Sequence, residues 1–94
     1  MELSEKQVFE LSSEVLFQEV SGELVLLDMA SESYFGLDEV GARVWSILGE
    51  GQSFGQVLDR LLEEYDVDRA TLESDVAALL DSLKEAGLIS VPKS

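Results

Sequence analysis

The chain has no cysteine and no histidine among its 94 residues. Without cysteine there can be no disulfide framework, and without both residue types the usual zinc ligands are missing. Histidine is also the most common general base, so the usual acid–base machinery is absent. We therefore expect no metal, no other cofactor and a reducing compartment, the cytoplasm.

Basic residues and long apolar runs are also scarce. Six basic residues face twenty acidic ones, which gives a formal charge of −14. This charge repels a polyanion, so nucleic acid is excluded as a partner, and most acidic side chains are explained as a solvated coat. No apolar run approaches the roughly 18 residues of a membrane span, and the N-terminal MELSEKQ does not resemble a signal peptide, so we predict no membrane contact.

A hydrophobic content of 46% suits one small domain with a modest core. Residues 1–13 are polar without a clear period, so we predict an N-terminal tail that becomes ordered only near Val15, followed by a domain over residues 14–91. Alternating and aromatic residues predict three strands, and the intervening turns make them an antiparallel meander. The strands are Val15–Val20, Glu23–Met29 and Ser33–Leu37.

Three helices are predicted after the strands. Their expected N-caps are Asp38, Ser53 and Asp68, because each offers a side-chain acceptor to the free amides of a helix start. Apolar stripes follow each cap, and glycines supply the stops. The sequence thus predicts an α+β fold of winged helix-turn-helix type, with a three-stranded antiparallel sheet followed by three helices.

This fold often binds DNA, but the predicted third helix has the wrong charge for it. Its charged residues are Glu73, Asp75, Asp81 and Glu85 against Arg69 and Lys84. Phosphate contacts need the opposite sign, so the DNA hypothesis fails.

The third predicted strand is short and has no later strand to pair with, so its outer edge is a docking template for an extended peptide. Tyr34 and Phe35 must point to opposite faces, and one of them belongs to the core. Gly36 indicates either the close approach of another backbone or a bend. Trp45 lies on an apolar helical stripe and is assigned to the core.

Several segments in the same order carry a family resemblance: LLDMASESYFGLDEVGARVWSIL, then EEYDVDRATLESDVAALLDSLKEAGLI. Over about residues 15 to 90 the chain resembles the PqqD-like family, also called the RiPP recognition element. The resemblance implies a non-catalytic domain that binds the leader of a ribosomally made precursor peptide as an added strand. It places the docking edge at Ser33, Tyr34, Phe35, Gly36 and Leu37 and a facing groove at Asp75, Val76, Leu79, Ser82 and Leu83.

The chain looks most similar to the stand-alone leader-binding proteins of lasso-peptide clusters, which implies a separate maturation enzyme, a cysteine leader peptidase. Two alternatives stay open: a pyrroloquinoline quinone pathway with a radical-SAM enzyme, and a regulatory winged-helix module. An enzyme built on paired carboxylates is disfavoured because so small a domain has little room for a cleft. The exposed edge also allows a strand-mediated homodimer.

Two further expectations concern single residues. Asp66 and Asp68 form a weak candidate for a cation site, since the rest of a calcium loop is missing. Ser33 and Phe35 are taken as the residues whose backbone faces the free edge, so proline at either position should weaken peptide binding. The sequence leaves open the precursor, the product and the oligomeric state.

Overall fold

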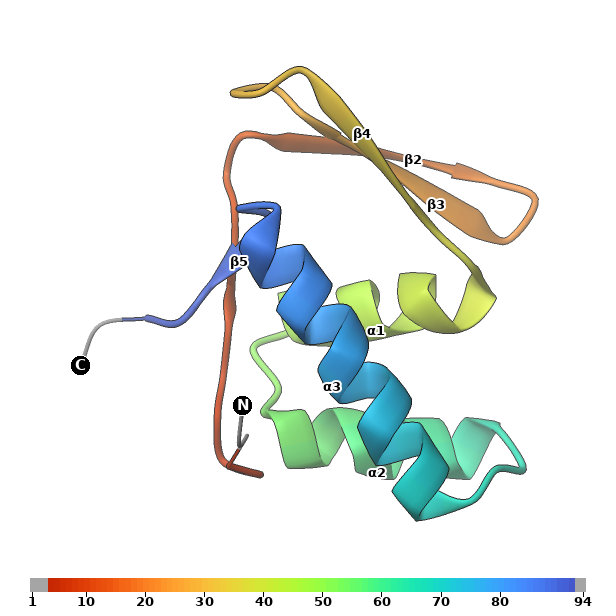
Figure 1. Cartoon of the computed structure of the whole chain (residues 1–94). Coiled ribbons are helices and arrows are strands. Elements are labelled where there is room, and N and C mark those ends of the chain that lie inside the picture. The colour runs from red at the N-terminus through yellow and green to blue at the C-terminus, as the bar shows by residue number, and fades with distance from the viewer. Residues whose placement is uncertain (1–3, 93–94) are drawn as a thin grey trace.

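The computed structural model describes residues 4–92 and contains one three-stranded sheet packed over three helices (Figure 1). The sheet is antiparallel, with the strand order β2-β3-β4. Its strands are β2 (Val15–Val20), β3 (Glu23–Asp28) and β4 (Ser33–Leu37). This part of the α+β prediction is confirmed.

The three helices begin at the caps that the sequence predicted. They are α1 (Glu39–Gly49), α2 (Phe54–Glu64) and α3 (Arg69–Glu85). The side chains of Asp38, Ser53 and Asp68 each accept a hydrogen bond from a backbone N–H in the first turn. These caps satisfy donors that a helix cannot satisfy itself, which is why the boundaries could be found locally.

The N-terminal segment differs from the predicted tail. Two short strands, β1 (Glu10–Leu11) and β5 (Ile89–Ser90), pair with each other, and Phe9 is buried in the core. Residues 4–12, here called the N-terminal strap, run along the edge of the helical layer in Figure 1. The prediction failed because the strap's partners lie far away in the sequence. Residues 1–3 of the predicted tail lie outside the described residues.

The core lies between the sheet and α1 and continues among the three helices. Leu26 from β3 and the α-helical residues Ile47, Leu58 and Leu80 have no exposed surface. Trp45 is only 5% exposed, which confirms it as a core residue. No helix within residues 4–92 is both long and apolar enough to cross a membrane.

Candidate functional site

Strand β4 is at the edge of the sheet and pairs only with β3 in the part of the chain that the structure describes. The register therefore decides which of its backbone groups face outwards. In an antiparallel pair, residues that exchange backbone hydrogen bonds alternate with residues that do not. Each β3 residue bonded to β2 directs its backbone groups away from β4, so the bonding pattern between β2 and β3 decides which residues of β4 are bonded to β3.

Two observations fix that phase. The loop Ser21-Gly22 has positive φ angles of 52° and 84°, as in a type I′ turn, whose closing pair is hydrogen-bonded. Farther along the same ladder, the N–H of Met29 donates to the carbonyl of Glu14 at 2.9 Å. Both observations indicate that residues 23, 25, 27 and 29 form backbone hydrogen bonds with the β2 side of the hairpin. Residues 24, 26 and 28 therefore form theirs with β4.

The free edge of β4 is consequently formed by Tyr34 and Gly36. The partners of residues 24, 26 and 28 are Leu37, Phe35 and Ser33, so these three are bonded to β3. Tyr34 and Gly36 direct their N–H and C=O groups away from the sheet. The prediction that the backbone groups of Ser33 and Phe35 face the free edge is therefore wrong. A sequence alone does not show which residues of a strand bond to the neighbouring strand.

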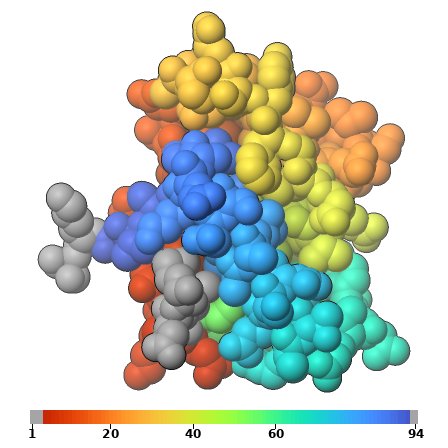
Figure 2. Space-filling model, in the orientation of Figure 1, coloured from red at the N-terminus to blue at the C-terminus, as the bar shows by residue number. Residues whose placement is uncertain are grey.

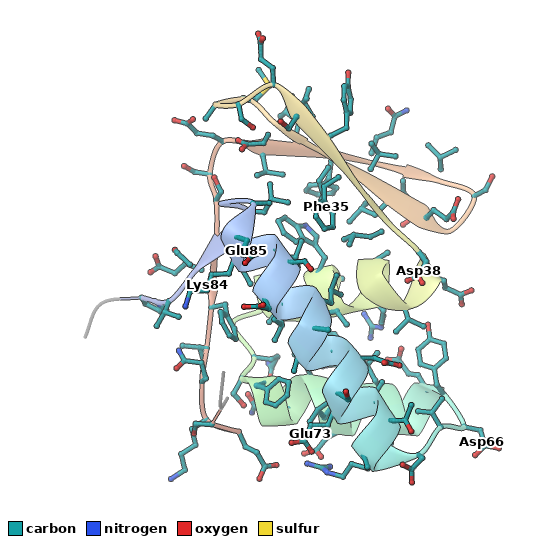
Figure 3. All side chains as sticks on the ribbon, viewed as in Figure 1. Phe35, Asp38, Asp66, Glu73, Lys84 and Glu85 are labelled. Atoms are coloured by element: carbon teal, nitrogen blue, oxygen red, sulfur yellow. The ribbon has the colours of Figure 1, made fainter. Side chains whose placement is uncertain are left out.

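The two faces of β4 have different surroundings. Phe35 lies opposite the fully buried Leu26 and points from the sheet towards the helices in Figure 3. Tyr34 lies on the other face and is 74% exposed. Of the two aromatic residues, Phe35 is therefore the one that packs against the core.

A groove of about 550 Å³ runs beside this edge, between β4, α1 and α3. In Figure 2 the surface of α3 lies directly beside that of β4 and the start of α1. The lining is mainly apolar, with carboxylates from Asp38 and Asp75 among it. It comprises Gly36, Leu37, Asp38, Val40, Gly41, Val44, Val67, Thr71, Leu72, Asp75, Val76 and Leu79.

The predicted groove residues fall into two groups. Asp75, Val76 and Leu79 line the groove together with Gly36 and Leu37 of the edge strand. Ser82 is exposed and Leu83 is completely buried, and neither lines the groove. The groove therefore lies about one helical turn nearer the start of α3 than predicted.

Sequence reasoning missed the residues that α1 and the α2–α3 turn contribute. Val40 and Val44 lie on α1 and Val67 lies in the turn between α2 and α3, and none of the three was predicted to line a groove. Thr71 and Leu72 lie one turn before Asp75 and Val76 on α3. Their spacing of three to four residues from Asp75 and Val76 places them on the same face of α3 and could have identified them. Which turn of α3 lies beside β4, however, is set by tertiary packing.

The junction between β4 and α1 shapes the end of the groove. The Asp38 carboxylate accepts a hydrogen bond from the N–H of Gly41 at 2.8 Å, and Figure 3 shows Asp38 at this turn. A Cβ atom at Gly41 would lie 3.3 Å from both Asp38 and Leu37. Glycine therefore keeps this end of the groove open and lets the helix start close to the strand.

The other end of β4 is held by Asp28, a polar residue that is only 8% exposed. Its carboxylate accepts hydrogen bonds from the N–H of Ala30 at 3.1 Å and from the hydroxyl of Ser31 at 2.8 Å. Such side-chain bonds stabilise a turn two to three residues on. The edge strand is thus fixed at both ends before any ligand binds.

An ion pair connects α1 and α2 behind the groove. The Arg43 guanidinium donates two hydrogen bonds of 2.7 Å to the Glu64 carboxylate. These bonds lower the pKa of Glu64 and raise that of Arg43. Burial, followed by the nearby Glu39 carboxylate, raises the pKa of Tyr65.

The arrangement offers free backbone hydrogen-bonding groups beside an apolar groove, and both features can hold an extended peptide. Within residues 4–92, no group of three or more His, Cys, Asp or Glu side chains could hold a metal ion. Asp66 lies in the turn between α2 and α3 (Figure 3), and Asp68 is engaged in capping α3.

Comparisons with known proteins relate the chain to a family and to solved structures. A model of the family described as coenzyme PQQ synthesis protein D (PqqD) matches residues 23–89. The structure is similar to one titled TbiB1 in complex with the TbiA(beta) leader peptide, with 36% identity, a TM-score of 0.82, and coverage of 90% of this chain and 99% of that one.

A second similar structure is titled lasso peptide synthetase B1 complexed with the leader peptide. It has 36% identity, a TM-score of 0.79, and coverage of 87% of this chain and 96% of that one. The comparison with curated proteins gives no match.

Proposed function

Because this chain belongs to the PqqD family, we propose that it is a non-catalytic adaptor in lasso-peptide biosynthesis. It binds the leader segment of a ribosomally made precursor as an additional strand on β4 and acts in the cytoplasm. The observation that carries the proposal is the unpaired β4 edge beside an apolar groove. The similarity to two proteins whose structures are titled as leader complexes supports it.

The leader would be held by two kinds of contact. Tyr34 and Gly36 offer four backbone groups, and each hydrogen bond contributes about 1 kcal/mol net. Alternate leader side chains then enter the groove and cover Val67 and Leu79. The backbone contacts supply affinity and the groove supplies specificity.

Glycine at position 36 fits this mode of binding. A Cβ atom there would meet no atom within 4 Å, and the φ angle is not in the positive range. The free fold therefore does not need glycine at this position. The open space beside Gly36 lets a second backbone approach the edge closely.

The adaptor presents the bound leader to a separate maturation enzyme, which we propose is a cysteine leader peptidase. The outer face of the sheet offers a surface for that enzyme, since it points away from the helices and the groove. Leu16, Val20, Val25 and Tyr34 on this face are 58%, 50%, 37% and 74% exposed. An apolar patch of this kind on a small protein is typical of an interaction site.

The alternatives receive less support. A partnership with a radical-SAM enzyme fits the name of the family model, but both similar structures concern leader peptides, and one is titled as a lasso peptide synthetase. A regulatory module would use the same edge with another protein. The winged-helix assignment of the fold and the use of the edge for homodimers also remain predictions.

The first experiment separates backbone from side-chain contacts. We expect Tyr34→Pro to weaken leader binding by about fivefold more than Tyr34→Ala, because only proline removes the free N–H. The ligand is the leader segment of a candidate lasso precursor peptide, and binding is measured by isothermal titration with circular dichroism as a folding check. Equal affinities of the two folded variants would disprove strand addition on β4.

The second experiment tests the groove. Val67 lines it and is 46% exposed, whereas Val91 is 41% exposed and lies outside its lining. We expect Val67→Ser to weaken leader binding by about two- to fivefold through lost apolar burial. Val91→Ser, the matched control, should bind as the parent does, and an equal loss in both variants would contradict the assignment of the groove.

The third experiment addresses the enzyme. With a cysteine leader peptidase of lasso-peptide biosynthesis and its precursor, the adaptor should lower the precursor concentration needed for half-maximal cleavage, since it tethers the substrate. Leu16→Asp on the outer face should abolish this effect and leave leader affinity unchanged. If the variant supports cleavage fully, the enzyme does not use this face.

A further inference from the structure

The sheet has a second free edge, on β2. Within residues 4–92 this strand pairs only with β3. Since Glu14 and residues 16, 18 and 20 are bonded to β3, Val15, Phe17 and Glu19 direct their N–H and C=O groups outwards. The β2 edge therefore repeats, on the opposite side of the sheet, the backbone arrangement of β4.

A second groove accompanies this edge. It has a volume of about 370 Å³ and lies between the inner face of the sheet and α1. Ala42, Trp45 and Ser46 face it from α1, with Trp45 and Ser46 about one helical turn after Ala42. Two of these side chains are small, so an incoming side chain can reach Trp45 on the floor of the groove.

Phe17 stands at the open side of this groove and is 66% exposed. Its partner across the ladder is Leu26, which is completely buried. Phe17 therefore belongs to the inner face of the sheet, but nothing within residues 4–92 covers its ring. A large apolar side chain seated in the groove would bury the ring.

The groove also has an acidic rim, formed by Glu19 and Glu50. Glu50 lies 3.5 Å from the Arg60 guanidinium, whereas Glu19 makes no ion pair in the described part of the chain. The net charge of −14 adds to the negative potential. A cationic ligand is therefore favoured, and a second copy of this acidic chain is disfavoured.

We propose that the β2 edge and its groove form a second binding site, for an extended segment of a basic partner protein. Side chains of an added strand alternate between faces, so residues two apart share the inner face. The segment therefore carries a large apolar residue opposite Phe17 and a lysine or arginine two residues away, opposite Glu19. This site is independent of leader binding on β4.

The test uses a synthetic probe with this pattern for an antiparallel added strand, acetyl-TKTFTVT-amide, whose lysine lies opposite Glu19 when its phenylalanine lies opposite Phe17, and a control in which glutamate replaces the lysine. In NMR titrations of the full chain labelled with ¹⁵N, the probe should shift the amides of Val15, Phe17 and Glu19. The control peptide should bind about fivefold more weakly, since an attraction becomes a repulsion. Phe17→Ala and Glu19→Gln should each weaken binding of the probe.

The variant Tyr34→Pro serves as the matched control, because it blocks the other edge and should leave probe binding unchanged. The proposal is overturned if the shifts are confined to Tyr34 and Gly36, if both peptides bind equally, or if no shift occurs at millimolar probe. If dilution of the protein alone reproduces the shifts at Phe17, the occupant is a second copy and the basic partner is wrong.

Discussion

At the scale of single residues, the Arg43–Glu64 ion pair helps to hold the candidate site in place. The pair joins the last turn of α2 to the helix that forms one wall of the groove, through two parallel hydrogen bonds. Both side chains are about one-third exposed, at 31% and 34%, so solvent screens much of the attraction. Its contribution should be visible chiefly as a pH dependence.

The pKa of Glu64 is lower in the folded state because Arg43 hydrogen-bonds to the charged carboxylate. A group with a lowered folded pKa stabilises the fold above its unfolded pKa, and this contribution is lost as pH falls through the folded value. We therefore expect Glu64→Gln to lower the melting temperature at neutral pH. The difference from the parent should shrink on acidification from about pH 6 to about pH 3.

Glu63→Gln is the matched control, since Glu63 is an exposed neighbour that forms no ion pair within residues 4–92. Its melting curve should differ little from that of the parent at any pH. A Glu64→Gln difference that stays constant down to acidic pH would show that the loss is steric rather than ionic.

At the scale of elements, the N-terminal strap is the part that the sequence did not predict. The carbonyls of Gln7 and Glu5 accept hydrogen bonds from the N–H groups of Phe54 and Gly55, each at 2.8 Å. The strap thereby satisfies free donors in the first turn of α2. Arg69 of α3 also contacts the Glu5 carboxylate at 2.8 Å, so the strap joins two helices.

Gly55 allows this close approach. A Cβ atom there would lie 2.9 Å from the Cβ atom and 3.0 Å from the carbonyl oxygen of Glu5. Alanine is the better helix former by about 1 kcal/mol, but displacing the strap should cost more. We expect Gly55→Ala to lower the melting temperature by several degrees and to speed hydrogen exchange at the amides of residues 54 and 55.

Gly49→Ala provides the comparison, because its Cβ atom would meet only Leu11 at an ordinary 3.4 Å. That variant should be as stable as the parent or slightly more stable. If Gly55→Ala is also as stable as the parent, the strap contributes little to the fold.

The elements that sequence reasoning found are those with local signals. Caps such as Ser53 with Gln56, which form a complete capping box, depend on residues three apart. The strap and the position of the groove depend on contacts between distant segments, such as Leu11 with Ile89. The resemblance supplied the edge strand and the helix that faces it. It did not show which residues of β4 bond to β3, or which turn of α3 lines the groove.

At the scale of the whole molecule, charge restricts the choice of partner. The formal charge of −14 acts over roughly the Debye length, about 8 Å at physiological salt. Both grooves have carboxylates in their lining, from Asp38 and Asp75 at β4 and from Glu19 and Glu50 at β2. The molecule should thus attract basic segments to both edges and repel polyanions everywhere.

The salt dependence of leader binding tests how much of the affinity comes from this charge. Backbone hydrogen bonds and apolar contacts are hardly screened, whereas attraction between exposed charges is. For a leader with basic residues we therefore expect affinity to fall only a few-fold between about 0.05 M and about 0.3 M salt. Fluorescence anisotropy with a labelled leader measures this, and duplex DNA under the same conditions should not bind, because its binding requires the release of counterions by basic residues. A loss of about a hundredfold would show that charge rather than strand addition holds the leader.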